Sequence, residues 1–315
     1  MRRPKQKGAA LIIFTVIFAL ATVALLISQL DGNAIKVDRD KKTAAALIEA
    51  KRALIGWSIT RNNPGQLPCP EDTSKINLPT EGDAMTNCNT LPAIGRLPWR
   101  ALKSGDLRDG HGERLWYVIS PGFRVSPISS ATAAQLTVNG VPNSAVAIIF
   151  SAGPPLPGQA RPTPTNTLPP NPAQYLDQSN NDGDGVFINM SPTNTYNDQL
   201  LTVSHNELFS VVLPRVLGEI KGDNTQGLVK FYSINSNNYP YADTNGDGVF
   251  NLGQLIGSPS YEGLSDNDPD NLFFNTAIKN MLLNNGWMSL VNYQVSADRQ
   301  SVVMILNSKS ITVMP

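Results

Sequence analysis

Residues 1–33 read MRRPKQKGAALIIFTVIFALATVALLISQLDGN, and this stretch decides how the rest of the chain is interpreted. The first eight residues hold no acidic side chain and four basic ones: Arg2, Arg3, Lys5 and Lys7. Residues 9–30 then run without a charge. About 20 apolar residues in a helix cross the ~30 Å hydrocarbon core of a bilayer, and flanking basic residues stay on its cytoplasmic side. The stretch predicts a transmembrane helix at 9–30 with a cytoplasmic N-terminus.

Three kinds of N-terminal segment fit this pattern in different degrees. A cleaved secretory signal has a shorter apolar region, of about 7–15 residues, that ends in a small-x-small cleavage site. Here the apolar run is longer, and residues 29–33 (QLDGN) make a poor site of that kind. A signal anchor that is never processed is the second possibility. The third is a leader that is cut before the apolar stretch.

Residues 5–13, KQKGAALII, carry a resemblance that favours the third possibility. They resemble the prepilin cleavage motif of type IV pilins and type II secretion pseudopilins. The resemblance implies that prepilin peptidase cleaves between Gly8 and Ala9 and that Ala9 is N-methylated. It also implies an inner-membrane protein with one span and a periplasmic or extracellular head, whose partners are prepilin peptidase, other pilins or pseudopilins, and the inner membrane.

One departure from the motif indicates which member of this family the chain resembles. Major pilins have Glu as the fifth residue after the cut, and Ile13 stands there in this chain. In that family the Glu serves subunit assembly. A carboxylate in lipid is costly unless it has a partner, which a neighbouring subunit supplies. Minor pilins, including those at a pilus tip, commonly lack this Glu. The departure therefore favours a minor pilin.

The helix is expected to continue beyond the apolar run. Between residues 34 and 61, apolar side chains recur at three- and four-residue spacing, which predicts an amphipathic helix; they are Ala44, Leu47, Ile48, Leu54 and Ile55. Turn residues at 62–65 (NNPG) end it. A long helix that packs on an antiparallel-sheet head is the pilin layout, so the expected fold class is α+β.

The head suggests two modules of the same kind. Residues 31–153 contain the helix at 34–61, a strand that includes YVIS at 117–120, and an apolar strand at 145–151. Residues 199–315 repeat this order with a capping box at Ser204–Glu207, YQVS at 293–296 and an apolar strand at 301–307. Residues 154–198 are rich in Pro, Asn and Gly and predict a linker or loop. The alternative is one pilin-like head with a large insertion.

Composition excludes some partners and leaves others open. Acidic and basic residues number 25 each, so no net charge attracts nucleic acid. Cys69 and Cys88 lie nineteen residues apart. In an oxidising compartment they form one disulfide, worth about 3 kcal/mol in the chain-entropy model. In a reducing cytosol they remain two free thiols.

One segment resembles a calcium loop. Asp243, Asn245, Asp247 and Asn251 alternate as in the first nine positions of an EF-hand, and Gly248 permits the sharp turn. The twelfth position should be acidic and is Gln254. The alternative is a plain Asx/Gly turn that needs no metal.

A missing carboxylate for that calcium loop could come from Asp266, Asp268 or Asp270. A weaker loop of the same shape contains Asn180, Asp182 and Asp184. Calcium is therefore a candidate cofactor, and no other is indicated.

Catalytic motifs are scarce. His111 lies between two glycines and His205 lies in a helix cap, so both are expected to be structural, and no enzyme activity is predicted. Four further stretches resemble proteobacterial proteins with prepilin leaders, which implies a pilus- or secretion-related role: 97–100, 112–117, 149–153 and 197–201. The expected function is that of a minor pilin or pseudopilin subunit that acts by helix-bundle assembly. The alternative is a surface adhesin, exported by a pilin leader, with calcium-ordered loops; a membrane-anchored hydrolase is a third possibility.

Overall fold

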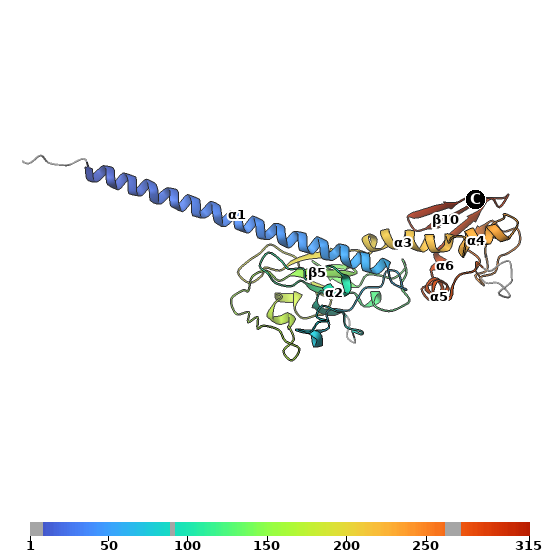
Figure 1. Cartoon of the computed structure of the whole chain (residues 1–315), viewed down its shortest axis with the longest axis horizontal. Helices are drawn as coiled ribbons and strands as arrows, with labels where there is room; N and C mark the ends of the chain where they lie inside the picture. Colours follow the sequence, from blue (N-terminus) through green and yellow to red (C-terminus); the bar gives the residue numbers. More distant parts are fainter. Residues whose placement is uncertain (1–8, 89–91, 262–271) are drawn as a thin grey trace, which may run out of the picture.

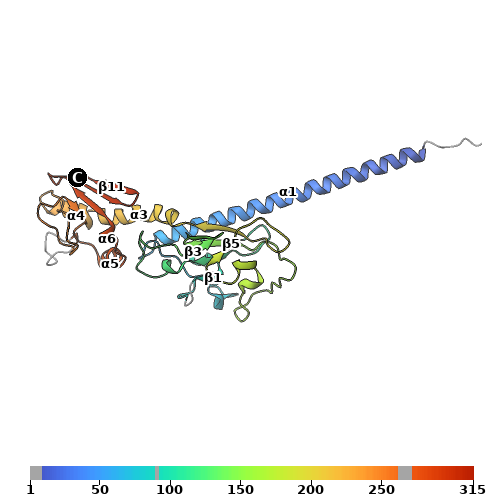
Figure 2. The same ribbon diagram turned by 180° about the vertical axis from the view of Figure 1, so that it is seen from behind.

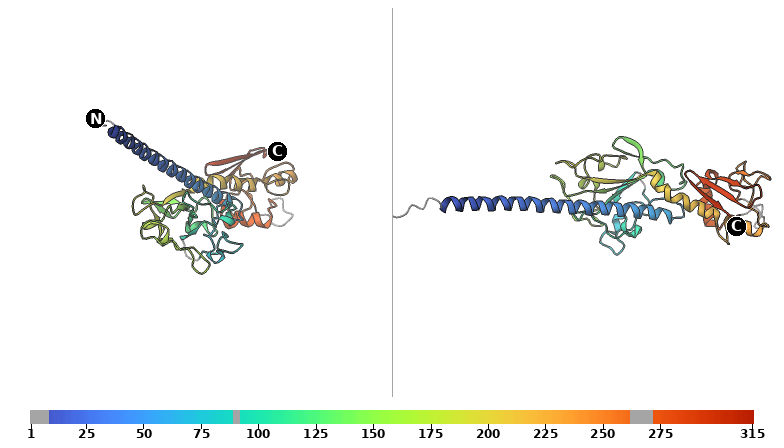
Figure 3. Two further views of the ribbon diagram at one scale, coloured as in Figure 1. Left: turned by 60° about the vertical axis from the view of Figure 1, so that its left-hand side comes forward. Right: turned by 90° about the horizontal axis from the view of Figure 1, so that it is seen from above.

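The structure is a computed structural model that describes residues 9–88, 92–261 and 272–315. Helix α1, Ala9–Ile59, is 51 residues long. Figure 1 shows its N-terminal half as a rod that projects away from the rest of the chain, while its C-terminal half lies along the head. The head has two lobes, and the second lies beyond the C-terminal end of α1. The views from behind and from above agree with this arrangement (Figures 2 and 3).

The prediction of a transmembrane helix at residues 9–30 is wrong. Across the described ranges, no helix has both the length and the apolar character that membrane crossing requires. The fold class is corrected to α+β with no membrane-spanning helix among the described residues, and the predicted single-pass inner-membrane localisation is corrected with it.

The C-terminal half of α1 packs on the first lobe through one face. The buried side chains recur every three or four residues, as an amphipathic helix requires: Thr43, Ala46, Leu47, Ala50, Leu54 and Ser58. Ala44 and Ile48, predicted to belong to the apolar stripe, are exposed instead. The small side chains of this face permit close approach, and the Gly110 N–H donates to Thr43 Oγ1 at 2.9 Å.

The first lobe is built on a four-stranded antiparallel sheet of order β1-β2-β5-β7. Its strands are β1 Ala93–Arg96, β2 Trp116–Ile119, β5 Ala147–Ser151 and β7 Gln199–Val203. Helix α1 covers one face of β5 and β7. A second apolar cluster, which includes Trp116, Ile148 and Phe150, covers the other face. Strand β5 is therefore buried on both faces, which explains its unbroken apolar sequence.

The rest of the first lobe is largely irregular chain. Helix α2 is Trp99–Leu102, and 3₁₀ turns are Thr73–Lys75, Pro121–Phe123, Pro172–Gln174 and Gln178–Asn180. A small sheet of order β4-β3-β6 contains β3 Leu136–Val138, β4 Val141–Ala145 and β6 Val186–Phe187. The segment 154–198, predicted as a linker or loop, lies on this lobe and buries Tyr175, Phe187 and Tyr196. Aromatic side chains thus fix it to the first lobe.

The second lobe repeats the four-stranded antiparallel order as β8-β9-β10-β11. Its strands are β8 Ile256–Gly257, β9 Asn292–Val295, β10 Val302–Leu306 and β11 Lys309–Val313. Its helices are α3 His205–Lys221, α4 Gly227–Ile234, α5 Thr276–Asn284 and α6 Trp287–Leu290. The capping box of Ser204 and Glu207 is present, and Pro214 lies inside α3. Helix α5 is capped by Asn275; the expected cap, Asp270, lies outside the described residues.

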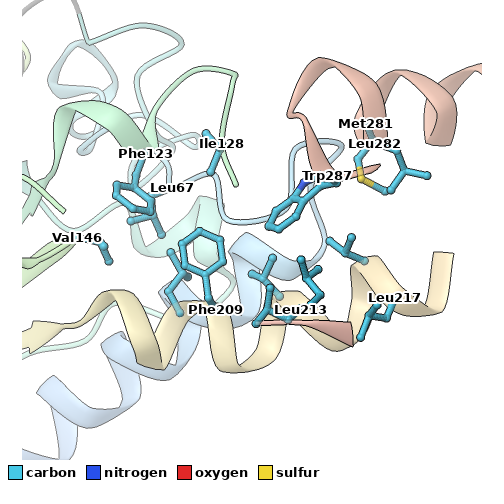
Figure 4. Close-up of a cluster of buried hydrophobic side chains, with 14 of the residues drawn as sticks. Leu67, Phe123, Ile128, Val146, Phe209, Leu213, Leu217, Met281, Leu282 and Trp287 are labelled. Atoms are coloured by element: carbon cyan, nitrogen blue, oxygen red, sulfur yellow. The ribbon is translucent and has the colours of Figure 1, made fainter. Parts of the chain in front are cut away.

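Helix α3 joins the two lobes through one continuous core. In Figure 4, Phe209, Leu213 and Leu217 line up along α3. The Phe209 ring lies 6.2 Å from that of Phe123 in the first lobe and 6.1 Å from that of Trp287 in the second, centroid to centroid. All of these side chains belong to a single buried cluster. The lobes therefore bury apolar surface jointly.

Candidate functional site

The projecting half of α1 carries a run of large, exposed apolar side chains. Phe14, Ile17, Phe18 and Leu20 are each 60–70% exposed, and Val16 is 52% exposed. These positions point in every direction around the helix, because consecutive residues are about 100° apart. A helix that is apolar all round is normally buried on all sides. In the isolated chain nothing among the described residues covers it.

The same helix changes character before it reaches the head. Residues 36–42 (KVDRDKK) are exposed and mostly charged. Beyond them, the buried face begins at Thr43. About two exposed, charged helical turns therefore separate the apolar projecting surface from the head-packing surface.

The predicted processing site lies at the edge of what is described. Gly8 lies outside the described residues, and Ala9 is the first residue of α1. The side chains of Ala9 and Ile13 are not described. Cleavage after Gly8 and methylation of Ala9 therefore stay predictions.

The predicted disulfide between Cys69 and Cys88 is confirmed. The two Cα atoms lie 5.8 Å apart, and the chain has no other cysteine. The Arg124 side chain donates from Nε to Cys69 Sγ at 3.0 Å. The alternative of two free thiols is excluded. The bond closes the loop that leads from the end of α1 to β1.

The Asp243 loop is held by its own hydrogen bonds. The buried Asp243 carboxylate accepts the backbone N–H groups of Asn245 and Gly246 at Oδ1 and of Gly248 at Oδ2, at 2.7–3.0 Å. Asn251 Oδ1 accepts from both the backbone and the hydroxyl of Thr244, at 2.7 Å. These contacts are those of an Asx turn.

The side-chain oxygens that would bind calcium therefore already accept hydrogen bonds from within the loop. Carboxylate and amide oxygens suit calcium, but the Asp247 carboxylate accepts from Asn245 Nδ2 at 2.8 Å and from the Val249 N–H at 2.8 Å. No group of three or more metal-binding side chains occurs in the described ranges. Asp266, Asp268 and Asp270 lie outside the described residues. Calcium binding by this loop stays a prediction, and a Ca²⁺ titration checks it.

The weaker loop separates into two unrelated environments. Asn180 is fully buried and donates from Nδ2 to Asp198 Oδ2 at 3.0 Å. Asp182 and Asp184 are exposed and accept the backbone N–H groups two residues onward. The three side chains therefore do not converge on one point, and the loop is a turn before β6.

Candidate catalytic groups are not arranged for nucleophilic chemistry. Ser151 Oγ donates directly to the buried Asp109 carboxylate at 2.7 Å, while the exposed His111 contributes its backbone N–H to that carboxylate at 2.8 Å. A nucleophile needs a base between itself and the acid. His205 is partly buried, its ring lies 4.5 Å from that of Phe209, centroid to centroid, and its Nε2 lies 3.1 Å from the Ser130 carbonyl oxygen.

No family model, curated protein or solved structure matches this chain. The argument for function therefore rests on the residues and their geometry.

Sequence reasoning missed one charged cluster. Arg96, Arg114 and Arg161 come from distant segments, and the fold brings them around one cavity with Tyr175. The buried Glu71 lies behind them, 3.7 Å from Arg114 Nη1. Burial raises the pKa of Glu71 to about 7, against the opposing charges of Arg114 and Arg96. No local motif marks these residues, because their proximity depends on the pairing of β1 with β2. The one sequence signal was Arg96 itself, because it is a charged residue at the end of the otherwise uncharged strand β1.

Proposed function

We propose that this protein is an assembly subunit of the minor pilin or pseudopilin kind, which joins a filament of a type IV pilus or type II secretion system through the projecting half of α1. It acts by packing its helix among the helices of neighbouring subunits and presenting its two-lobed head outward. Its role is structural rather than catalytic.

The observation that carries this proposal is the exposure of Phe14, Ile17 and Phe18 on a helix that projects from the head. Burying apolar surface contributes roughly 25 cal/mol per Å². A contiguous exposed apolar surface of this kind marks an interaction site. Residues 14–20 are apolar on all sides except Thr15, so a single flat partner cannot cover them. Several neighbouring helices can.

The occupant that fits best is a helix of the same kind from another subunit. Helices pack along apolar ridges at interaxial distances of about 8–10 Å, and a bundle surrounds each member with apolar neighbours. The exposed, charged segment at 36–42 then lies where the bundle ends and the heads begin. This matches the division of α1 into an apolar projecting half and a head-packing half.

The prepilin-like motif supports the same proposal from the sequence. If the motif is functional, prepilin peptidase removes residues 1–8 and α1 starts the mature chain. The test is the intact mass of the protein expressed with and without a prepilin peptidase. We expect a chain that begins at methylated Ala9 only with the peptidase. A mass that retains residues 1–8 in both cases contradicts the pilin part of the proposal.

The adhesin alternative has weaker support. It requires calcium-ordered loops as a binding face, and the Asp243 loop is already ordered by hydrogen bonds to its own backbone. No observation favours it over assembly.

A further inference from the structure

A polar cavity of about 380 Å³ lies in the first lobe, away from α1's projecting half. Its wall includes four arginines, at positions 96, 108, 114 and 161, together with Glu81 and Glu113. A volume of this size is in the range of small-molecule sites. Charged walls of this density are unusual for a cavity that only fills space.

Three of the four arginines have carboxylate partners. Arg114 pairs with Glu81 and, from Nε at 2.9 Å, with Asp106. Arg108 Nη2 also pairs with Asp106 at 2.7 Å. Arg161 pairs with Glu113 at 3.3 Å and donates to the Gly153 carbonyl at 2.8 Å. Their charges are compensated inside the protein.

Arg96 is the exception. It is the last residue of β1, its residue exposure is only 6%, and its Nε is buried. No residue that the structure describes accepts a hydrogen bond from this Nε. The guanidinium carbon of Arg96 lies 5.6 Å from the centroid of the Tyr175 ring, and that of Arg161 lies 5.2 Å from the same centroid. A buried N–H donor without an acceptor is costly, so an anion in the cavity that reaches this Nε would stabilise the site.

Glu71 is the carboxyl group whose charge acts most on Arg96, but the two side chains form no ion pair. Both of its carboxyl oxygens are buried without a hydrogen bond, and its closest cation contact is Arg114 Nη1 at 3.7 Å. Burial raises its pKa to about 7, so a large share of the carboxyl is neutral near that pH. Glu71 therefore leaves much of the Arg96 charge uncompensated.

We propose that this cavity binds a ligand through a single carboxylate group, which the guanidinium of Arg96 holds in a two-point contact. A guanidinium fork matches a carboxylate in geometry. Because the other three arginines are paired with carboxylates, Arg96 supplies a single uncompensated positive charge, which matches a monoanion better than a phosphate dianion. The carboxylate belongs either to a free small acid or to the C-terminus of a polypeptide.

The test is calorimetric titration of the full chain at neutral pH with four probes: acetate, inorganic phosphate, N-acetyl-Gly-Ala with a free carboxylate, and its C-terminal amide. We expect saturable binding of the free carboxylates, and at least about tenfold weaker binding of the amide, as lost charge-assisted hydrogen bonds imply. If acetate binds as tightly as the peptide, the ligand is a small acid. If the peptide binds more tightly, the ligand is a polypeptide terminus.

The matched variants are Arg96→Gln and Arg100→Gln. Arg100 lies four residues away on α2, pairs with Asp83 and is half-exposed outside the cavity wall. Arg96→Gln should weaken carboxylate binding by about tenfold or more, whereas Arg100→Gln should leave it unchanged.

With the wild-type chain, three results overturn the proposal: no saturable binding of either carboxylate, equal affinity for the free peptide and its amide, or phosphate binding that is tighter than acetate binding. Wild-type affinity in Arg96→Gln also overturns it. The comparison of the peptide with its amide uses only the wild-type chain, so it decides the matter even where Arg96→Gln fails to fold.

Discussion

The hydroxyl of Tyr293 donates a hydrogen bond to the backbone carbonyl of Pro240 at 2.7 Å, inside the second lobe. The first lobe contains the same contact, from the Tyr117 hydroxyl to the Pro68 carbonyl at 3.1 Å. Each tyrosine lies opposite a glycine on the neighbouring edge strand, Gly257 and Gly95. Together with the shared strand order, these contacts favour two related modules over one module with an insertion.

The tyrosine contacts predict matched losses of stability. Tyr293→Phe and Tyr117→Phe each remove the donor and leave a buried carbonyl without a partner. We expect each to lower the free energy of unfolding by about 1–3 kcal/mol, measured by urea denaturation. Tyr241→Phe is the control, because Tyr241 is half-buried, packs on Phe250 and forms no hydrogen bond from its hydroxyl within the described ranges. If all three variants were equally stable, the two tyrosine hydrogen bonds to the proline carbonyls would not stabilise the fold, which would contradict this prediction.

Two buried carboxyl groups predict an unusual pH dependence. Burial raises the pKa of Glu71 and of Asp198 to about 7 in each case. An acid with a raised pKa binds protons more strongly folded than unfolded, so the free energy of unfolding falls as pH rises from about 4 to about 7.

The size of that effect follows from linkage. Each unit of pKa shift corresponds to about 1.4 kcal/mol, so the two groups together cost on the order of several kcal/mol above neutral pH. Asp198→Asn should flatten the fall in Tm between pH 4 and pH 7, whereas Asp182→Asn, at an exposed turn, should not. Stability that rises steadily over this interval would contradict the burial argument.

The disulfide predicts a defined loss on removal. The Cys69→Ser/Cys88→Ser double variant opens the closed loop between α1 and β1 in the unfolded chain. We expect a loss of about 3 kcal/mol of unfolding free energy, seen in chemical denaturation under non-reducing conditions. Treatment of the wild-type protein with a reductant should reproduce it, and no difference between oxidised and reduced protein would contradict the structural role of the bond.

The Asp243 loop predicts local rather than global damage. Asp243→Ala leaves the N–H groups of Asn245, Gly246 and Gly248 without their acceptor. We expect the free energy of opening this loop to fall by about 1–3 kcal/mol, and proteolysis within residues 243–251 to become faster. Asp247→Ala is the matched comparison, because this exposed carboxylate accepts only one backbone N–H among the described residues, that of Val249, and its loss should cost less. Identical cleavage rates in the two variants would show that the buried carboxylate does not order the loop.

Local patterns predicted the strands and the caps. The apolar run at 145–151 became β5 because α1 and a second cluster cover both its faces. The capping box at Ser204 and Glu207 and the cysteine pair also formed as expected. In each case the signal lies within a short stretch of chain, where spacing and residue type are sufficient.

The packing of segments that are distant in the sequence could not be predicted from the sequence. The Pro-rich segment at 154–198 looks like a linker, but Tyr175 and Phe187 fix it to the first lobe. The apolar run at 9–30 suggested a membrane span, and the structure does not provide one in the described ranges. The arginine cavity had no local signal, because its residues meet only after β1 pairs with β2.

The central claim is that residues 14–20 of α1 pack against other subunits. Ala19→Cys places a thiol on this surface, and it is the only free thiol because Cys69 and Cys88 are bonded to each other. Val125→Cys, at a position that is 63% exposed on the head, is the matched control. Both variants are oxidised in the cells that assemble the protein and resolved on non-reducing gels. The account predicts disulfide-linked dimers for Ala19→Cys and monomers for Val125→Cys; monomers for Ala19→Cys, or equal dimers for both, would contradict it.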